Sequence, residues 1–179
     1  MGSGITEVGA RAGLSVVNLE VDDDAAKRAA ERVEGSLRKA EQRGKLTAED
    51  VTDTLERMTF TSDLEALADR DLVVEAASED EQTKLQLFRT LGSLLESDDA
   101  VLASNTSSIP IVKLGAVSGR ADRVMGVHFF NPAPVMKLVE LIPSLTTSPE
   151  TLQRMQSFVG DTLGKEPIEA TDRAGFVVN

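Results

Sequence analysis

The sequence predicts an α/β fold in which a parallel sheet carries helices on both faces. Short apolar, β-branched stretches recur along the chain, as at residues 72–76 and 100–104. Longer segments with apolar residues at helical spacing separate them, as at 21–43 and 78–97. This alternation of strand and helix is typical of a parallel sheet covered by helices. The chain has 179 residues, which is enough for one domain with a buried core.

Local signals mark where several of these elements begin and end. A first helical pattern ends at Gly13, and glycine commonly follows a helix C-terminus. Residues 47–50, TAED, form a capping box, and Pro149 suits the first turn of a helix. The expected helices span residues 5–12, 21–43, 47–58, 62–69, 78–97, a short segment after residue 110, and 148–163. The expected strands span residues 15–20, 59–61, 72–76, 100–104, 124–127, 135–141 and 166–170.

Composition excludes several classes of function. The chain has no cysteine, so disulfides, a thiolate metal site and a catalytic thiol are excluded, and with one histidine a structural zinc site is not expected. Its net charge of −11 argues against general nucleic-acid binding. No apolar run approaches the roughly 18 residues of a membrane span, and no signal peptide is visible. We therefore expect a cytoplasmic protein with no membrane partner.

Polar residues follow several expected strands at the point where each strand ends. They are Glu20, the loop after residues 72–76, the run NTSS at residues 105–108, and residues 128–131. Ligands of open α/β sheets bind at the carboxyl ends of the strands, so these groups are expected to converge. Residues 105–108 could offer neutral donors to a substrate oxygen and a nicotinamide. The alternative is a turn with local side-chain hydrogen bonds.

The segment 123–140 holds the strongest candidate for catalysis. Its apolar run delivers His128, the only histidine, and two turn-forming prolines then separate it from a second strand that presents Glu140. A carboxylate on one ring nitrogen would fix the tautomer and leave the other nitrogen for proton transfer. The alternatives are a half-buried histidine with ordinary partners and a solvent-facing acid on the strand.

The N-terminus carries a possible remnant of a dinucleotide site. Gly2 and Gly4 could form the end of a glycine-rich turn against which a pyrophosphate packs, although such a sequence is also common in an unstructured terminus. Glu20 lies at the end of the next strand, where an acid binds ribose hydroxyls and disfavours a 2′-phosphate. This position favours NAD over NADP. The alternative for Glu20 is an ordinary acid at the start of a helix.

Four segments together resemble the NAD-binding domain of the L-3-hydroxyacyl-CoA dehydrogenases, above all the 3-hydroxybutyryl-CoA dehydrogenases. They are VVEAASEDEQTK (73–84), SNTSSIP (104–110), GVHFFNPAPVMKLVELI (126–142) and DRAGFVVN (172–179). The resemblance implies a Rossmann-type, doubly wound, mostly parallel sheet over residues 1–171. It also implies NAD-dependent oxidation of a 3-hydroxyacyl-CoA, of short chain, to the 3-ketoacyl-CoA in fatty-acid or butanoate metabolism. Intact members of the family are homodimers.

The resemblance also assigns roles to individual residues. His128 matches the catalytic base, Glu140 its orienting carboxylate, and Ser107 the serine on the substrate oxygen. The full catalytic set that it implies is His128, Glu140, Ser107 and Asn179. The positions that it implies for NAD are Gly2, Glu20, Glu79, Lys84, Ser107 and Asn131. The positions that it implies for CoA are Ser36, Arg43 and Ser107, with arginine at 43 where the family usually has lysine.

Two departures from the family pattern bear on activity. The first strand and the first two glycines of the motif are missing before Met1, and residues 172–179 stand where the connection to a helical second domain would begin. We therefore expect unpaired strand edges, weak NAD affinity and little turnover. Two alternatives remain: an inactive remnant or interaction module on this scaffold, and a related dehydrogenase that acts on a free 3-hydroxy acid.

Overall fold

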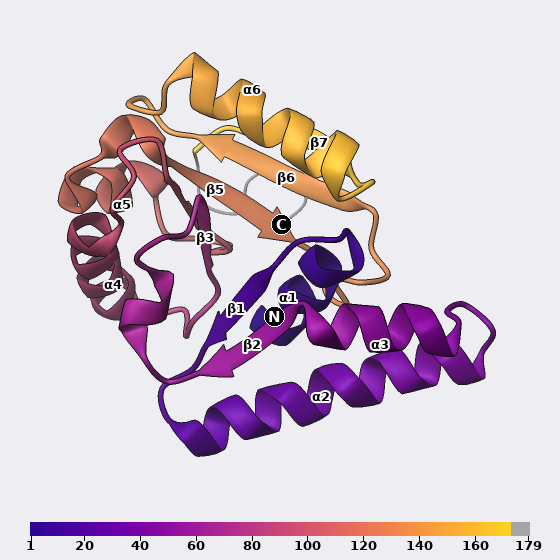
Figure 1. Ribbon diagram of the computed structural model, residues 1–179. Helices are drawn as coiled ribbons and strands as arrows, with labels where there is room; N and C mark the ends of the chain where they lie inside the picture. Colours follow the sequence, from indigo (N-terminus) through magenta and orange to yellow (C-terminus); the bar gives the residue numbers. More distant parts are fainter. Residues whose placement is uncertain (173–179) are drawn as a thin grey trace. The chain divides into compact units, whose positions relative to one another are not determined.

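The structure, a computed structural model, describes residues 1–172 and divides the chain into two compact units (Figure 1). Unit 1 comprises Met1–Ala66 and Pro132–Val135, and unit 2 comprises Leu67–Asn131 and the chain from Met136 onward. Each unit has its own sheet.

Helices and strands alternate along most of the chain, as the sequence predicts. The helices are α1 (Gly2–Arg11), α2 (Asp23–Gln42), α3 (Ala48–Glu56), α4 (Glu81–Leu94), α5 (Ile111–Ser118) and α6 (Pro149–Ser157). Shorter helical segments are η1 (Leu64–Leu67), η2 (Ala121–Arg123) and η3 (Phe158–Thr162). The strands are β1 (Val16–Leu19), β2 (Met58–Thr61), β3 (Leu72–Glu75), β4 (Val101–Ser104), β5 (Val124–Phe129), β6 (Leu138–Pro143) and β7 (Glu166–Glu169).

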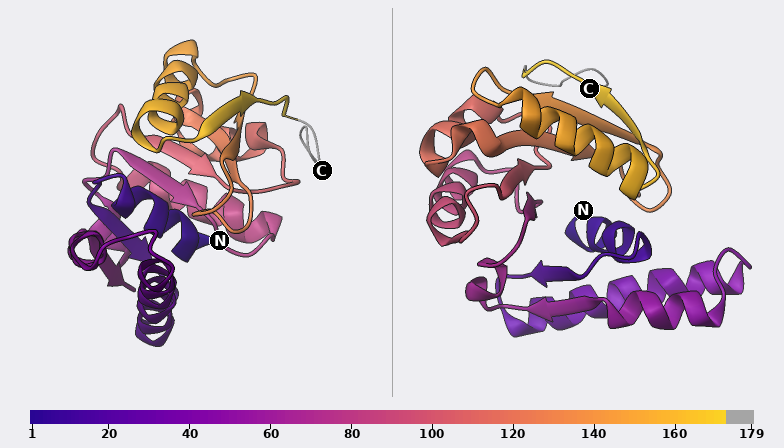
Figure 2. Two further views of the ribbon diagram at one scale, coloured as in Figure 1. Left: turned by 90° about the vertical axis from the view of Figure 1, so that its right-hand side faces the viewer. Right: turned by 45° about the horizontal axis from the view of Figure 1, so that its top comes forward.

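Unit 1 is built on the parallel pair β1–β2 and a hairpin of two helices. Figures 1 and 2 show α2 and α3 lying side by side. Their apolar faces meet over a core made of Val33, Leu37 and Val51. The capping box is confirmed, because the Asp50 amide donates to Thr47 Oγ1 over 3.1 Å and the Thr47 amide donates to Asp50 Oδ2 over 2.8 Å.

The first helix ends as its glycine predicts. Gly13 has a φ of +88°, a left-handed conformation that a residue without a Cβ adopts readily. The Gly13 amide donates to the Ala10 carbonyl, and the Leu14 amide donates to the Gly9 carbonyl. This pair of bonds defines a Schellman motif, which satisfies carbonyls at the end of α1 and turns the chain toward β1.

Unit 2 holds a five-stranded sheet in the order β3-β4-β5-β6-β7. The pairs β3–β4, β4–β5 and β6–β7 are parallel, whereas β5 and β6 are antiparallel. All six residues of β5 are buried, which agrees with its apolar sequence and its central place. The expectation of a mostly parallel sheet in an α/β fold is confirmed.

Several predicted boundaries are wrong, and for two of them the structure shows a local reason. Helix α4 begins at Glu81 instead of residue 78, because the Asp80 side chain caps it by accepting a bond from the Thr83 amide. Strand β6 begins at Leu138 instead of residue 135, because the Val135 amide closes a turn. Residues 62–69 form only the short η1, the strand from 124 continues to Phe129, and the helix from 149 becomes the π-helical η3.

The strand ladder is not continuous through the described residues. Strand β1 pairs only with β2, and β3 pairs only with β4, within residues 1–172. Each of these two strands therefore has one edge without a ladder partner in that part of the chain, as expected. A strand edge without a ladder partner leaves backbone donors and acceptors that another strand can pair with.

Substituting Gly92 by alanine should destabilise unit 2. A Cβ at Gly92 would lie 1.8 Å from the carbonyl oxygen of Ser118, where α4 and α5 approach each other. Relief requires the two helices to separate, so we expect a loss of at least about 2 kcal/mol of unfolding free energy. Urea denaturation measures it. The matched control is Gly35→Ala on α2, where nothing lies within 4 Å, and a Gly92→Ala variant as stable as this control would contradict the packing account.

Candidate active site

The antiparallel pairing of β5 and β6 places His128 directly opposite Glu140. The distance between His128 Nδ1 and Glu140 Oε2 is 2.7 Å. Glu140 is fully buried and His128 is 7% exposed, so the interpretation of Glu140 as a solvent-facing acid is wrong. A carboxylate at Nδ1 favours the tautomer with its hydrogen on that nitrogen, and Nε2 then carries the lone pair that can accept a proton.

Two further contacts hold the histidine and the end of its strand. The rings of His128 and Phe130 meet edge to face, with centroids 4.8 Å apart and an interplanar angle of 61°. The Phe129 amide donates to the Asn105 side-chain oxygen over 2.8 Å. The Asn105 amide in turn donates to the carbonyl of Glu75 over 2.8 Å. The ends of β3, β4 and β5 are thus connected, as expected for polar groups at one edge of a sheet.

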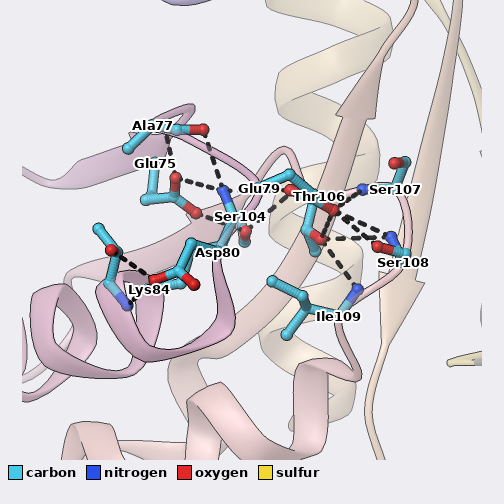
Figure 3. A network of polar contacts seen from close by, with 11 residues as sticks. Glu75, Ala77, Glu79, Asp80, Lys84, Ser104, Thr106, Ser107, Ser108 and Ile109 are labelled. Carbon is cyan, nitrogen blue, oxygen red and sulfur yellow. Dashed lines mark hydrogen bonds and ion pairs between the residues drawn. The ribbon is translucent and has the colours of Figure 1, made fainter.

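The loop 105–108 is organised around the carboxylate of Glu79 (Figure 3). Its Oε1 accepts bonds from the amides of Ser107 (2.9 Å) and Ser108 (3.2 Å). The hydroxyls of Ser108 (3.0 Å) and Thr106 donate to the same oxygen. The loop is therefore more than a turn with local side-chain hydrogen bonds, because a side chain from another segment holds it.

The electrostatics of Glu79 follow from these contacts. Partial burial acts to raise the pKa of Glu79. The hydrogen bonds from Thr106, Ser107 and Ser108 and the positive charge of Lys84 outweigh that effect, so the pKa lies below its ordinary value. Glu79 is therefore an anion near neutral pH.

Lys84 is turned inward rather than toward solvent. Its side chain is 1% exposed, and its Nζ lies 2.6 Å from Glu75 Oε1 and 3.4 Å from Glu79 Oε2. It also donates to the Ala77 carbonyl over 3.3 Å. Ser104 Oγ donates to Glu75 Oε2 over 2.7 Å. Sequence reasoning assigned roles to Glu79 and Lys84 but missed Glu75 and Ser104, although an acid at the end of the buried strand β3 was a visible signal.

The remaining candidate residues are distributed over both units. Glu20 follows β1, and its amide donates to the Thr61 carbonyl. Ser36 and Arg43 are two helical turns apart at the C-terminal end of α2. The unit 1 candidates are Gly2, Glu20, Ser36 and Arg43, and the unit 2 candidates are Glu79, Lys84, Ser107, His128, Asn131 and Glu140. Asn131 is exposed, and Asn179 lies outside the described residues.

Residues 1–172 contain neither a candidate metal centre nor a candidate membrane-spanning helix. Nowhere in this range do three or more metal-binding side chains gather in a way that could hold an ion. None of the helices in it combines the length and the apolar composition that crossing a bilayer requires.

The chain belongs to the family of the NAD-binding domain of 3-hydroxyacyl-CoA dehydrogenases, whose model matches residues 1–173. This finding confirms the resemblance and the expected cofactor, NAD.

Two relatives and one crystal structure show how close the likeness is. The chain is 46% identical over 179 residues to 3-hydroxybutyryl-CoA dehydrogenase of Mycobacterium tuberculosis and 44% identical over 180 residues to a probable 3-hydroxybutyryl-CoA dehydrogenase of Deinococcus radiodurans. Both matches cover 100% of this chain and 63% of the relative. The crystal structure of FadB2 from Mycobacterium tuberculosis superposes with a TM-score of 0.98 at 46% identity, covering 100% of this chain and 63% of that one. The superposition confirms the Rossmann-type fold.

Acid should loosen the loop 105–108 only below the ordinary glutamate pKa. A carboxylate with a lowered pKa stabilises the folded state above its unfolded pKa, and this contribution is lost as the pH falls through the folded value. The amide chemical shifts of Ser107 and Ser108 should therefore titrate with a midpoint below 4.5, the ordinary value for Glu79. The Glu79→Gln variant should lack this titration. A midpoint at or above 4.5 would show that the carboxylate does not hold the loop.

Proposed function

We propose that residues 1–171 form the NAD-binding and proton-transfer part of an L-3-hydroxyacyl-CoA dehydrogenase. The observation that supports this most strongly is the buried His128–Glu140 pair, with 2.7 Å between Nδ1 and Oε2. A histidine oriented by a carboxylate is suited to remove the proton of a hydroxyl group. The names of the relatives favour a short-chain substrate such as 3-hydroxybutyryl-CoA.

The residues of unit 1 are chemically suited to NAD. Helix α1 begins at Gly2 without a side-chain cap, so its first amides are donors of the kind that binds a pyrophosphate. Glu20 follows β1 and supplies the acceptor that ribose hydroxyls require. NAD, when bound, accepts the hydride that leaves C3 of the substrate.

The residues of unit 2 account for the proton and the substrate oxygen. In the proposed reaction His128 Nε2 takes the proton of the 3-hydroxyl group as C3 becomes a carbonyl, and Glu140 stabilises the resulting imidazolium. The loop that carries Ser107 holds the oxygen on which negative charge develops. The products are the 3-ketoacyl-CoA, NADH and a proton on His128. Ser36 and Arg43 are proposed to contact the CoA moiety, and the protein is proposed to form a homodimer.

The substitution His128→Gln should lower NAD-dependent oxidation of 3-hydroxybutyryl-CoA by at least about 100-fold. The reason is that glutamine cannot accept the hydroxyl proton at neutral pH. NADH binding, followed by calorimetry, should be unchanged. Since weak affinity is expected, NAD is supplied in large excess, and NADH formation is followed by absorbance. The control is Glu169→Gln, an exposed acid on β7, the strand that pairs with β6, and it should leave turnover unchanged.

Three outcomes would contradict the proposal. Turnover of His128→Gln near that of the unmodified chain would remove the histidine from the mechanism. Oxidation of free 3-hydroxybutyrate but not of its CoA thioester would favour the dehydrogenase of a free acid. Absence of both NADH binding and turnover in the unmodified chain would favour a scaffold or interaction module.

A further inference from the structure

The carboxylate of Glu75 is a buried charge that the proposed proton transfer does not use. It lies at the carboxyl end of β3, in the apolar run LVVE, and the residue is 6% exposed. Removing a carboxylate from water is costly unless hydrogen bonds and an opposite charge compensate for it. The hydrogen-bond partners of Glu75 therefore indicate its role in the structure.

Three donors from three segments converge on this carboxylate (Figure 3). Its Oε1 accepts from Lys84 Nζ on α4 and from the Ala77 amide, both over 2.6 Å. Its Oε2 accepts from Ser104 Oγ at the end of β4 over 2.7 Å. Each of these bonds has a carboxylate as its acceptor, so each is stronger than a bond between neutral groups.

One line of contacts leads from Glu75 to the start of the serine loop. Because Ser104 Oγ donates its hydrogen to Glu75, its lone pairs point elsewhere, and one accepts from the Thr106 amide over 3.2 Å. Thr106 Oγ1 then accepts from the amides of Ile109 (3.0 Å) and Ser108 (3.3 Å). The Glu75 carboxylate thus orients the Ser104 hydroxyl, which accepts a hydrogen bond from the loop backbone at Thr106.

A second line of contacts leads through Lys84 to the other side of the loop. The ammonium donates to Glu75 Oε1 and to the Ala77 carbonyl, and it forms an ion pair with Glu79 Oε2. Glu79 in turn accepts from the amides of Ser107 and Ser108. Lys84 acts on this loop through the carboxylate of Glu79, and the pairing with Glu75 turns it in that direction.

We propose that Glu75 is a positioning residue that fixes the loop 105–108 from both sides, through Ser104 and through Lys84. The loop carries Ser107, and the role of Ser107 toward the substrate rests on the proposed function. The ordering of the loop by Glu75 is independent of that function.

Stability alone does not account for this arrangement. Replacing a buried ion pair by neutral groups of similar size is often neutral for stability or even favourable. Neutral groups can fill the same space, but they cannot orient the Ser104 hydroxyl and the Glu79 carboxylate together. A positioning role and a purely structural role therefore predict different behaviour once both charges are removed.

The test compares Glu75→Gln with the double variant Glu75→Gln/Lys84→Met. The single variant keeps the size of the side chain but cannot accept from all three donors, and it leaves the Lys84 ammonium short of an anion. The double variant contains no unpaired buried charge, so its thermal stability should recover toward that of the unmodified chain. The matched control is Lys113→Met on α5, because that lysine pairs with the partly exposed Glu81 and not with Glu75 or Glu79.

Hydrogen exchange at the amides of Thr106, Ser107 and Ser108 is the primary measurement. In both Glu75 variants we expect exchange at these amides to accelerate about tenfold or more, because the bonds that hold the loop are lost. The control should not change it. In the single variant Glu75→Gln, which keeps Lys84, the Kd for NADH should rise while that of the control stays constant.

Two results would overturn the proposal. One is a folded double variant whose loop amides exchange as slowly as in the unmodified chain. The other is a double variant that fails to fold, since this would assign the pair to folding alone. If the unmodified chain does not bind NADH, the proposed function fails, but the exchange measurement still decides the role of Glu75.

Discussion

The register of β5 against β6 is the constraint on which the candidate active site depends. In the observed pairing His128 faces Glu140, and Gly126 faces Ile142. A slip of one residue would turn every side chain of β6 to the other side of the sheet and separate the histidine from its carboxylate. The space at Gly126 helps to define this register, because a Cβ there would come within 3.0 Å of Ile142 and Ile111. Packing of the sheet therefore determines the chemistry at its edge.

Unit 2 contains two buried carboxylates, Glu140 and Glu75, that are stabilised in the same way. In each case a carboxylate is buried at or near a strand end and must be hydrogen-bonded to be tolerated. Glu140 meets this requirement with the histidine, and Glu75 meets it with Lys84, Ser104 and the Ala77 amide. We propose that the first pairing sets the tautomer of a proton acceptor and that the second sets the position of a loop. Because a buried carboxylate without hydrogen bonds is costly, each acid favours the one arrangement in which its partners can reach it.

Most helices and strands could be predicted from the sequence. Side-chain directions and the pairing of distant residues could not, because they depend on the path of the chain in space. Strand and helix periodicity, the glycine at 13 and the capping box at 47–50 were local signals, and they were interpreted correctly. The start of β6 at Leu138 was not, because the run from Val135 has strand-like composition although a proline turn holds its first residue. The inward direction of Lys84 depends on the path of the chain between β3 and α4, which periodicity does not report. The separation of twelve positions between His128 and Glu140 did not by itself place them opposite each other.

The most direct test of this account is the tautomer of the single histidine, observed by NMR of its ring nitrogens. Since the chain contains one histidine, the signals need no assignment. At a pH where the ring is neutral, the account predicts a hydrogen on Nδ1 and a lone pair on Nε2, and it predicts that Glu140→Gln lowers the population of this tautomer. A ring that carries its hydrogen on Nε2 in the unmodified chain would contradict the claim that Glu140 prepares His128 to accept a proton.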